Sequence, residues 1–372
     1  MLNELTDLKK EFFLLIFLIF LSGRPVFSQV DSLAKGYAIA DTQNVKVTLF
    51  DTDDLFKITL RFDISYYKKK KSDVEYLDAV LTYFNNKKDS VSKNIKVRAR
   101  GNIRRTDLCD FPPLMLNFKM KDSKGNEFSG INKLKLVPYC RVGYEELILK
   151  EYLVYKLYNV LTDLSYRVRL FKITYINTSK ERKPITQFGF AIEPKELLEK
   201  RTSSKEITTQ GISQITVEPK ILERVAIFNY MIGNTDWSVP ILHNVLLLSN
   251  SKTVASKENL LVPFDFDYSG LVNAEYAVPF MNLPIKTVRD RFYLAVCRDE
   301  TSFKNALAEF SEKKNDIYKV VNDFPYLNAR SKKDMIKYLD EFFNEINGRN
   351  TLVKRLLEDC QWFEEHANLK IR

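Results

Sequence analysis

Hydrophobic and polar positions follow a two-residue period through the first half of the chain. Between Phe56 and Ile64, apolar side chains occupy every second position, which is typical of a half-buried strand. The strands predicted in this way are 45–50, 56–64, 76–84, 95–100, 114–120, 133–138, 169–177 and 187–193. Turn-forming residues separate these segments, so we expect an antiparallel, β-rich N-terminal region.

A helical period interrupts the strands once and then dominates the rest of the chain. Apolar positions and Glu151 form one stripe that predicts a helix over 144–161. A second helix is predicted over 218–232, with Gly233 as its C-cap, and short apolar strands are predicted at 242–248 and 260–266. From about residue 289 onward the pattern is amphipathic helix, so the fold class is α+β.

This change of pattern also divides the chain. We predict a β-rich lobe with one helix over 29–193 and a mainly helical lobe over 194–372, with the boundary near Glu193. The stretch 201–211 is rich in Ser, Thr and Lys and is predicted to be a mobile loop. Lys68 to Lys71 is predicted to be an exposed loop tip, with an anionic envelope surface as the less favoured partner.

The first residues have the features of a secretory signal. Lys9 and Lys10 precede an apolar run, and the small residues around Ser28 suit cleavage, so 1–28 is predicted to be a signal peptide. An uncleaved membrane anchor is the alternative, because acidic residues weaken the positive region. No later segment is apolar enough to span a membrane, so we expect an exported protein in the periplasm, cell envelope or medium.

Charge bears on the class of binding partner, and cysteine content bears on possible disulfides. The formal charge is +10, but basic residues are spread among 48 acidic ones, so a specific nucleic-acid partner is not expected. Export would allow disulfides, and the 4 cysteines allow three pairings. We favour Cys109 with Cys140 and Cys297 with Cys360, because the first two flank a β-rich region and the last two lie in a helical one.

Three polar clusters lie where a packed core would prefer apolar residues. Asp236 follows the predicted helix, Asn244 precedes an apolar strand, and Asp265-Phe266-Asp267 closes the next strand. Phosphoryl transfer needs a carboxylate for the acceptor hydroxyl and oxygen ligands for magnesium. Protein kinases present these groups in the same chain order, although here the third element lacks the kinase glycine. Each cluster alone is more typical of a turn or a capped strand end.

Taken together, these blocks resemble the spore-coat CotH kinase family. The resemblance covers about half of the chain, from Lys93 to Gly270, and is most specific at 233–237 and 262–267. It implies a bilobal atypical protein-kinase-like fold that binds ATP and magnesium and phosphorylates proteins on serine. Toxin kinases of the HipA type have a similar Asn-Thr-Asp element.

The resemblance assigns roles to individual residues. Asp236 would be the catalytic aspartate, Asn244 and Asp265 would bind the metal, and Asp267 would support it. The implied cofactor-binding residues are Arg100, Gly101, Lys135, Glu151 and Glu193.

The resemblance does not identify the residue that binds the phosphates. The family usually has a basic residue in the strand after the Arg-Gly-Asn turn, where this chain has Met115. Lys119, Lys133 and Lys135 are candidates, and Arg104 or Arg105 could add charge. Lys135 is favoured, because its strand precedes the helix that carries Glu151, so the two residues could form an ion pair like that of kinases.

We therefore expect an exported atypical kinase that transfers the γ-phosphate of ATP to a Ser/Thr protein acceptor outside the cytoplasm. The alternative is a kinase-like envelope protein without catalytic activity. A Ser-His-Asp hydrolase is disfavoured, because the chain has only 2 histidines and no Gly-x-Ser-x-Gly elbow.

Overall fold

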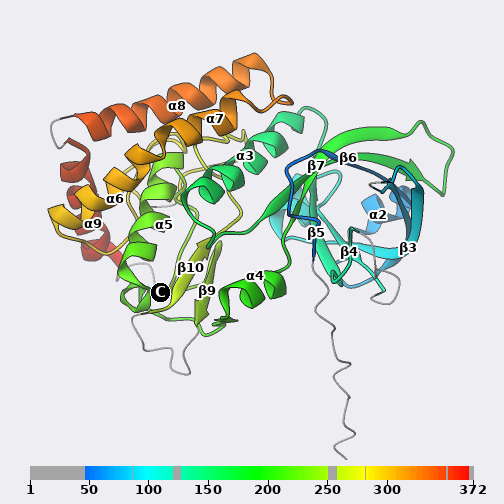
Figure 1. The fold of residues 1–372 in the computed structure, drawn as a ribbon, viewed down its shortest axis with the longest axis horizontal. Coiled ribbons are helices and arrows are strands. Elements are labelled where there is room, and N and C mark those ends of the chain that lie inside the picture. Colours follow the sequence, from blue (N-terminus) through cyan, green and yellow to red (C-terminus); the bar gives the residue numbers. More distant parts are fainter. Residues whose placement is uncertain are drawn as a thin grey trace, which may run out of the picture. The chain divides into compact units, whose positions relative to one another are not determined.

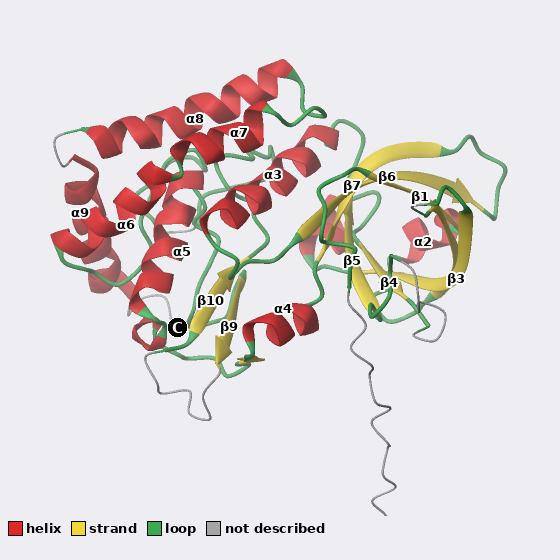
Figure 2. Ribbon diagram, in the orientation of Figure 1, coloured by secondary structure: helices red, strands yellow, loops and turns green. Residues whose placement is uncertain are grey.

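The computed structural model describes residues 47–85, 87–119, 127–249, 258–280, 282–348 and 351–367. All of them belong to one compact unit, Val45–Arg372. The predicted signal segment 1–28 lies outside the described residues, and the division at residue 193 stays a prediction. Strands gather in the N-terminal part and helices in the C-terminal part, which confirms the α+β class (Figure 1, Figure 2).

A closed seven-stranded barrel forms the N-terminal part. Its strands are β1 (Phe56–Phe62), β2 (Leu77–Phe84), β3 (Ser90–Ala99), β4 (Leu114–Asn117), β5 (Lys133–Pro138), β6 (Val168–Asn177) and β7 (Ile185–Ile192). They are ordered β1-β2-β3-β4-β5-β7-β6, and the parallel pairing of β1 with β6 closes the barrel. The other neighbours are antiparallel, so the prediction of an antiparallel sheet is wrong at this pair.

The predicted alternation places side chains in the barrel interior. Ile58, Leu60 and Phe62 of β1 are buried, as are Ala79, Leu81 and Tyr83 of β2. In place of the predicted strand over 45–50, residues 49 and 50 lie in a turn and residues 47 and 48 have no regular structure. Helix α2 (Ile64–Lys70) replaces the predicted loop tip, because Asp63 caps it and its lysines lie at the negative end of the helix dipole.

The C-terminal part is built on two helices that the sequence predicts. Helix α3 (Glu145–Leu161) packs against β7, and α5 (Pro219–Ile232) packs against β10. Gly233 ends α5 with a φ of +66°, and a Cβ there would lie 2.1 Å from the Tyr338 hydroxyl. This position therefore requires glycine on both grounds.

Shorter elements complete the structure. Strands β8 (Lys205–Glu206), β9 (Val245–Ser249) and β10 (Leu260–Pro263) form a small sheet in the order β10-β9-β8. The remaining helices are α4 (Lys195–Thr202), α6 (Glu300–Glu312), α7 (Lys314–Asn322), α8 (Ala329–Asn347) and α9 (Thr351–Ala367). Helix α4 and strand β8 occupy part of the stretch predicted to be a mobile loop. No described helix combines the length and the apolar character needed to cross a bilayer.

Two disulfides confirm the favoured pairing. Cys109 is bonded to Cys140 beside the barrel, and Cys297 is bonded to Cys360 of α9. Both bonds are compatible with export to an oxidising compartment.

Loss of either disulfide should destabilise the protein. The double variants Cys109→Ser/Cys140→Ser and Cys297→Ser/Cys360→Ser release loops with sequence separations of 31 and 63. We expect each to lower the free energy of unfolding by about 3 kcal/mol, because the unfolded chain gains freedom. Urea unfolding measures this change. An unchanged midpoint in a double variant would show that its disulfide does not constrain the unfolded chain.

The stability of the helical region should depend on the protonation of Asp359. Its carboxylate accepts the backbone N–H of Tyr293 at 3.0 Å, and burial raises the pKa of Asp359 to about 7. The folded state therefore binds this proton more tightly than the unfolded state. The resulting stabilisation is present at low pH and is lost as the pH rises from about 4 to about 7. Asp359→Asn should flatten the decline in unfolding free energy between pH 5 and pH 8, measured by urea unfolding, whereas Glu365→Gln, at an exposed position of the same helix, should not.

Candidate functional site

The turn after α5 presents Asp236. Asn234 is buried, and its side-chain amide donates to Asn229 Oδ1 at 2.9 Å. Its own Oδ1 accepts the backbone N–H of Asp236 at 3.1 Å. The asparagine therefore fixes the backbone from which the Asp236 side chain projects.

Both carboxylate oxygens of Asp236 have partners. Asn244 Nδ2 donates to Oδ2 and to the backbone carbonyl of Asp236, each at 2.8 Å. His243 Nε2 lies 2.8 Å from Oδ1, and this hydrogen bond to Asp236 raises the pKa of His243. Asn244 has a φ of +51°, which turns its side chain back toward Asp236. Only Oδ1 of Asn244 is left to contact a metal.

Asp265 and Asp267 follow β10, as the sequence predicts for a strand end. The backbone N–H of Asp265 donates to the Tyr155 hydroxyl at 2.8 Å, and Asp265 has a φ of +62°. Phe266 between them is buried, with ring contacts to Tyr155 and Phe228 at 4.8 and 5.7 Å. Packing of Phe266 in the aromatic core therefore fixes the position of the segment from Asp265 to Asp267.

The acidic cluster consists of Glu151, Asp265 and Asp267, each of which has a carboxylate oxygen within 4.8 Å of the others. Arg104 lies among them: its Nη2 is 2.6 Å from Asp267, 2.8 Å from Glu151 and 3.9 Å from Asp265. The side chains of Glu151 and Asp267 are only 1% and 7% exposed. Burial raises the pKa of both acids, and Arg104 opposes this rise.

Arg104 replaces the expected partner of Glu151. The sequence predicts a pair between Lys135 and Glu151, but the carboxylate of Glu151 binds Arg104, and the Lys135 ammonium lies over the Phe264 ring at 5.9 Å. A π-helical turn, η1 (Arg104–Leu108), starts at this arginine just after Gly101, whose φ is +89°. Such a turn has no strong sequence signal, and this explains why the pairing was missed.

The cavity cations are Arg100 and Lys135. Burial lowers the pKa of each, and the charge of Arg100 lowers that of Lys135 further, while Asp265 opposes the shift in both. Within the described part of the chain, neither side chain forms an ion pair or a hydrogen bond. A buried cation without a counter-charge is a ready contact for an anionic ligand.

These groups line one cavity of about 410 Å³. Seven predicted site residues border it: Arg100, Gly101, Lys135, Asp236, Asn244, Asp265 and Asp267. Glu151 lies behind Arg104 and is not in the lining. A second cavity of about 350 Å³ shares Lys135, Tyr166 and Phe264 with the first, and its other walls include Met115 and Leu242.

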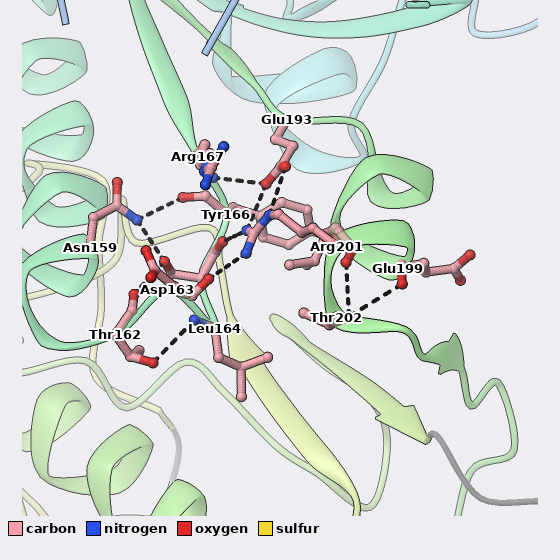
Figure 3. Close-up of polar contacts among 12 residues, drawn as sticks. Asn159, Thr162, Asp163, Leu164, Tyr166, Arg167, Glu193, Glu199, Arg201 and Thr202 are labelled. Carbon is pink, nitrogen blue, oxygen red and sulfur yellow. Dashed lines mark hydrogen bonds and ion pairs between the residues drawn. The ribbon is translucent and has the colours of Figure 1, made fainter. Parts of the chain in front are cut away.

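Glu193 is not part of the cavity lining, although the sequence resemblance places it among the cofactor-binding residues. Its carboxylate accepts hydrogen bonds from Arg201 Nε at 3.0 Å, Arg201 Nη2 at 2.9 Å and the backbone N–H of Arg167 at 3.1 Å (Figure 3). Arg201 also donates to the backbone carbonyls of Asp163 and Ser165. We call these contacts of Glu193 and Arg201 the Glu193 clasp. They join α4, the end of β7 and the connection between α3 and β6.

His243 and Arg104 are the site residues whose contacts the sequence did not predict. His243 directly precedes Asn244, and this adjacency was the available signal. Arg104 was considered only as extra charge beside the Arg-Gly-Asn turn.

Comparisons with known proteins leave the family of the chain open. No family model matches the sequence, and no curated protein matches it. Among solved structures, the chain is similar to the Helicobacter pylori proinflammatory kinase CtkA, with 14% identity and a TM-score of 0.39. The match covers 71% of this chain and 94% of that one. A likeness this distant leaves the reaction to be argued from the site itself.

The Glu193 clasp should be structural. Arg201→Ala leaves a buried carboxylate without its cation, so we expect a loss of about 3 kcal/mol in unfolding free energy. The double variant Glu193→Gln/Arg201→Ala should lose less than the sum of the single variants, because the two side chains form one interaction. Chemical unfolding of all three variants tests this coupling, and strict additivity would contradict it.

Proposed function

We propose that this protein is a magnesium-dependent kinase that transfers the γ-phosphate of ATP to a Ser or Thr hydroxyl of an extracytoplasmic protein. One observation carries the proposal. A single cavity brings together a hydrogen-bonded aspartate, carboxylates that could hold a metal, and two cations that form no ion pair with the described residues. Phosphoryl transfer needs these three kinds of group in one place.

Asp236 is the residue proposed to receive the acceptor hydroxyl. Hydrogen bonds from Asn244 and His243 fix the orientation of its carboxylate, so little reorganisation is needed when the hydroxyl arrives. The half-exposed His243 occupies Oδ1 of Asp236 at 2.8 Å. The hydroxyl would then approach Asp236 from the cavity.

The same cavity offers a set of oxygen donors that suits magnesium. Asp265 and Asp267 supply carboxylate oxygens, and Asn244 Oδ1 supplies an amide oxygen. Oε1 of Glu151 is buried and has no hydrogen-bond partner among the described residues, so it offers a further oxygen. When bound, magnesium offsets negative charge on the transferred phosphoryl group.

The nucleotide would span both cavities. Arg100 and Lys135 would contact the phosphates, since they line the first cavity and form no ion pair or hydrogen bond with the described residues. The second cavity has apolar walls that include Met115, Tyr166 and Leu242, which suit a planar base. Lys135 and Phe264 lie at the junction of the two spaces.

A kinase-like envelope protein without catalytic activity is the second candidate. The ion pairs of Arg104 favour it, because a guanidinium already neutralises carboxylates that a metal would need. The two candidates differ in phosphate transfer and in metal-dependent nucleotide binding.

Thermal unfolding with ATP and magnesium tests the proposal. A ligand that binds only the folded state should raise the melting temperature, with about 2.7 kcal/mol of stabilisation at a hundredfold excess over the dissociation constant. Asp265→Ala should abolish this shift. Asp236→Asn should keep the shift but stop transfer of radiolabelled phosphate to protein acceptors.

Asp316→Asn, on α7, is the matched control and should behave like the unmodified protein. No thermal shift at millimolar nucleotide would contradict nucleotide binding. A shift without any phosphate transfer by the unmodified protein would favour the second candidate, and unimpaired transfer by Asp236→Asn would overturn its assigned role.

A further inference from the structure

The acidic cluster holds three carboxylates around one cation. Arg104 uses Nη2 for Glu151 and both Nη2 and Nε for Asp267. Asp267 Oδ2 accepts a further hydrogen bond from the Tyr276 hydroxyl at 3.0 Å. Oε1 of Glu151 remains buried without a partner. The cluster therefore retains an unused ligand atom even with Arg104 in place.

The backbone that carries Arg104 is fixed, whereas its side chain alone reaches the acids. The Cys109 N–H donates to the Arg104 carbonyl at 3.1 Å, and Cys109 is bonded to Cys140. The Arg141 guanidinium donates to the Leu108 carbonyl, and Arg105 Nε donates to the Gly101 carbonyl at 3.0 Å. Movement of Arg104 out of the cluster would thus be a side-chain rotation and not an unfolding of the turn.

A divalent cation and the guanidinium would compete for the same oxygens. Magnesium approaches carboxylate oxygens to about 2.0–2.1 Å and requires near-octahedral geometry. The Arg104 nitrogens lie 2.6 to 3.0 Å from Asp267 Oδ2, so they occupy the space from which a metal would approach. Two cations on one carboxylate also repel each other at this separation.

We propose that Arg104 is a resident counter-cation of the metal site: a divalent cation binds Glu151, Asp265 and Asp267 only when the Arg104 guanidinium leaves them. This inference rests on the proposed function for the presence of a metal at Asp265 and Asp267. It adds Glu151 as a ligand and makes metal binding an exchange of cations.

The exchange couples metal binding to nucleotide binding. Arg104 lines the cavity that Arg100 and Lys135 also border, so a displaced guanidinium would add a third cation there. Phosphates would stabilise the displaced side chain, and metal binding would in turn strengthen phosphate binding, since such coupling is reciprocal. Metal alone should therefore bind weakly, and metal with nucleotide should bind strongly.

Manganese binding to the full chain without nucleotide tests the exchange. Titrations followed by the electron paramagnetic resonance of free Mn²⁺ compare the unmodified protein with Arg104→Gln and Arg104→Lys. Arg104→Gln should bind Mn²⁺ about tenfold more tightly, because the competing charge is gone. Arg104→Lys, which keeps a charge, should stay close to the unmodified protein.

Arg182→Gln is the matched control, since Arg182 is exposed between β6 and β7 and lines neither cavity. Unchanged or weaker Mn²⁺ binding by folded Arg104→Gln would overturn the exchange and leave the proposed function intact. No Mn²⁺ binding by any variant, even with ATP, would overturn both.

A second measurement does not depend on variants. Nuclear magnetic resonance of the Arg104 Nε–H in the unmodified protein should show faster hydrogen exchange when Mg²⁺ is added to saturation without nucleotide, because the hydrogen bond to Asp267 is lost and no phosphate replaces it. Retained protection in the metal-bound protein would overturn the exchange.

Discussion

The buried guanidinium of Arg104 is the contact on which the arrangement of the site depends. It joins the π-helical turn after β3 to Glu151 of α3 and to Asp267 after β10. Two acids buried this deeply could not both carry charge without a cation between them. The ion pairs of Arg104 therefore connect a loop of the barrel to the helical part and hold Glu151 and Asp267 close together.

Aromatic packing holds the backbone on which this charge cluster rests. Tyr155 contacts Phe190 of β7 at 5.6 Å and Phe266 at 4.8 Å, and its hydroxyl accepts the N–H of Asp265. One side chain of α3 therefore fixes the barrel, the strand end and an exposed acid. The left-handed conformations of Asn244 and Asp265 persist because these neighbours determine the backbone from both sides.

The sequence predicted those features that depend on local period or on the order of polar groups. The alternation in β1, the helical stripe of α3 and the C-cap at Gly233 reflect local physics, and the structure confirms them. Their order along the chain also predicted that Asp236, Asn244 and Asp265 share a cavity.

What the sequence did not predict depends on long-range partners. Nothing in β1 or β6 indicates that they pair in parallel, because burial patterns specify a face and not a neighbour. Likewise, whether Glu151 pairs with Lys135 or with Arg104 depends on the conformation of the turn after Gly101, which places Arg104 beside Glu151. Arg201 lies in a polar stretch without periodicity, and its role appears only when Glu193 is adjacent.

The cavity presents acidic and basic groups to the same ligand. Asp236, Asp265 and Asp267 border it together with Arg100 and Lys135, and neither cation forms an ion pair among the described residues. A metal alone would satisfy the acids but would have to displace Arg104, and a phosphate alone would satisfy the cations but leave the acids facing it. A ligand that carries a divalent cation on its phosphates meets both needs at once and offers the displaced arginine a new partner. Under the proposed function, the site would therefore favour a metal–nucleotide complex over either component alone.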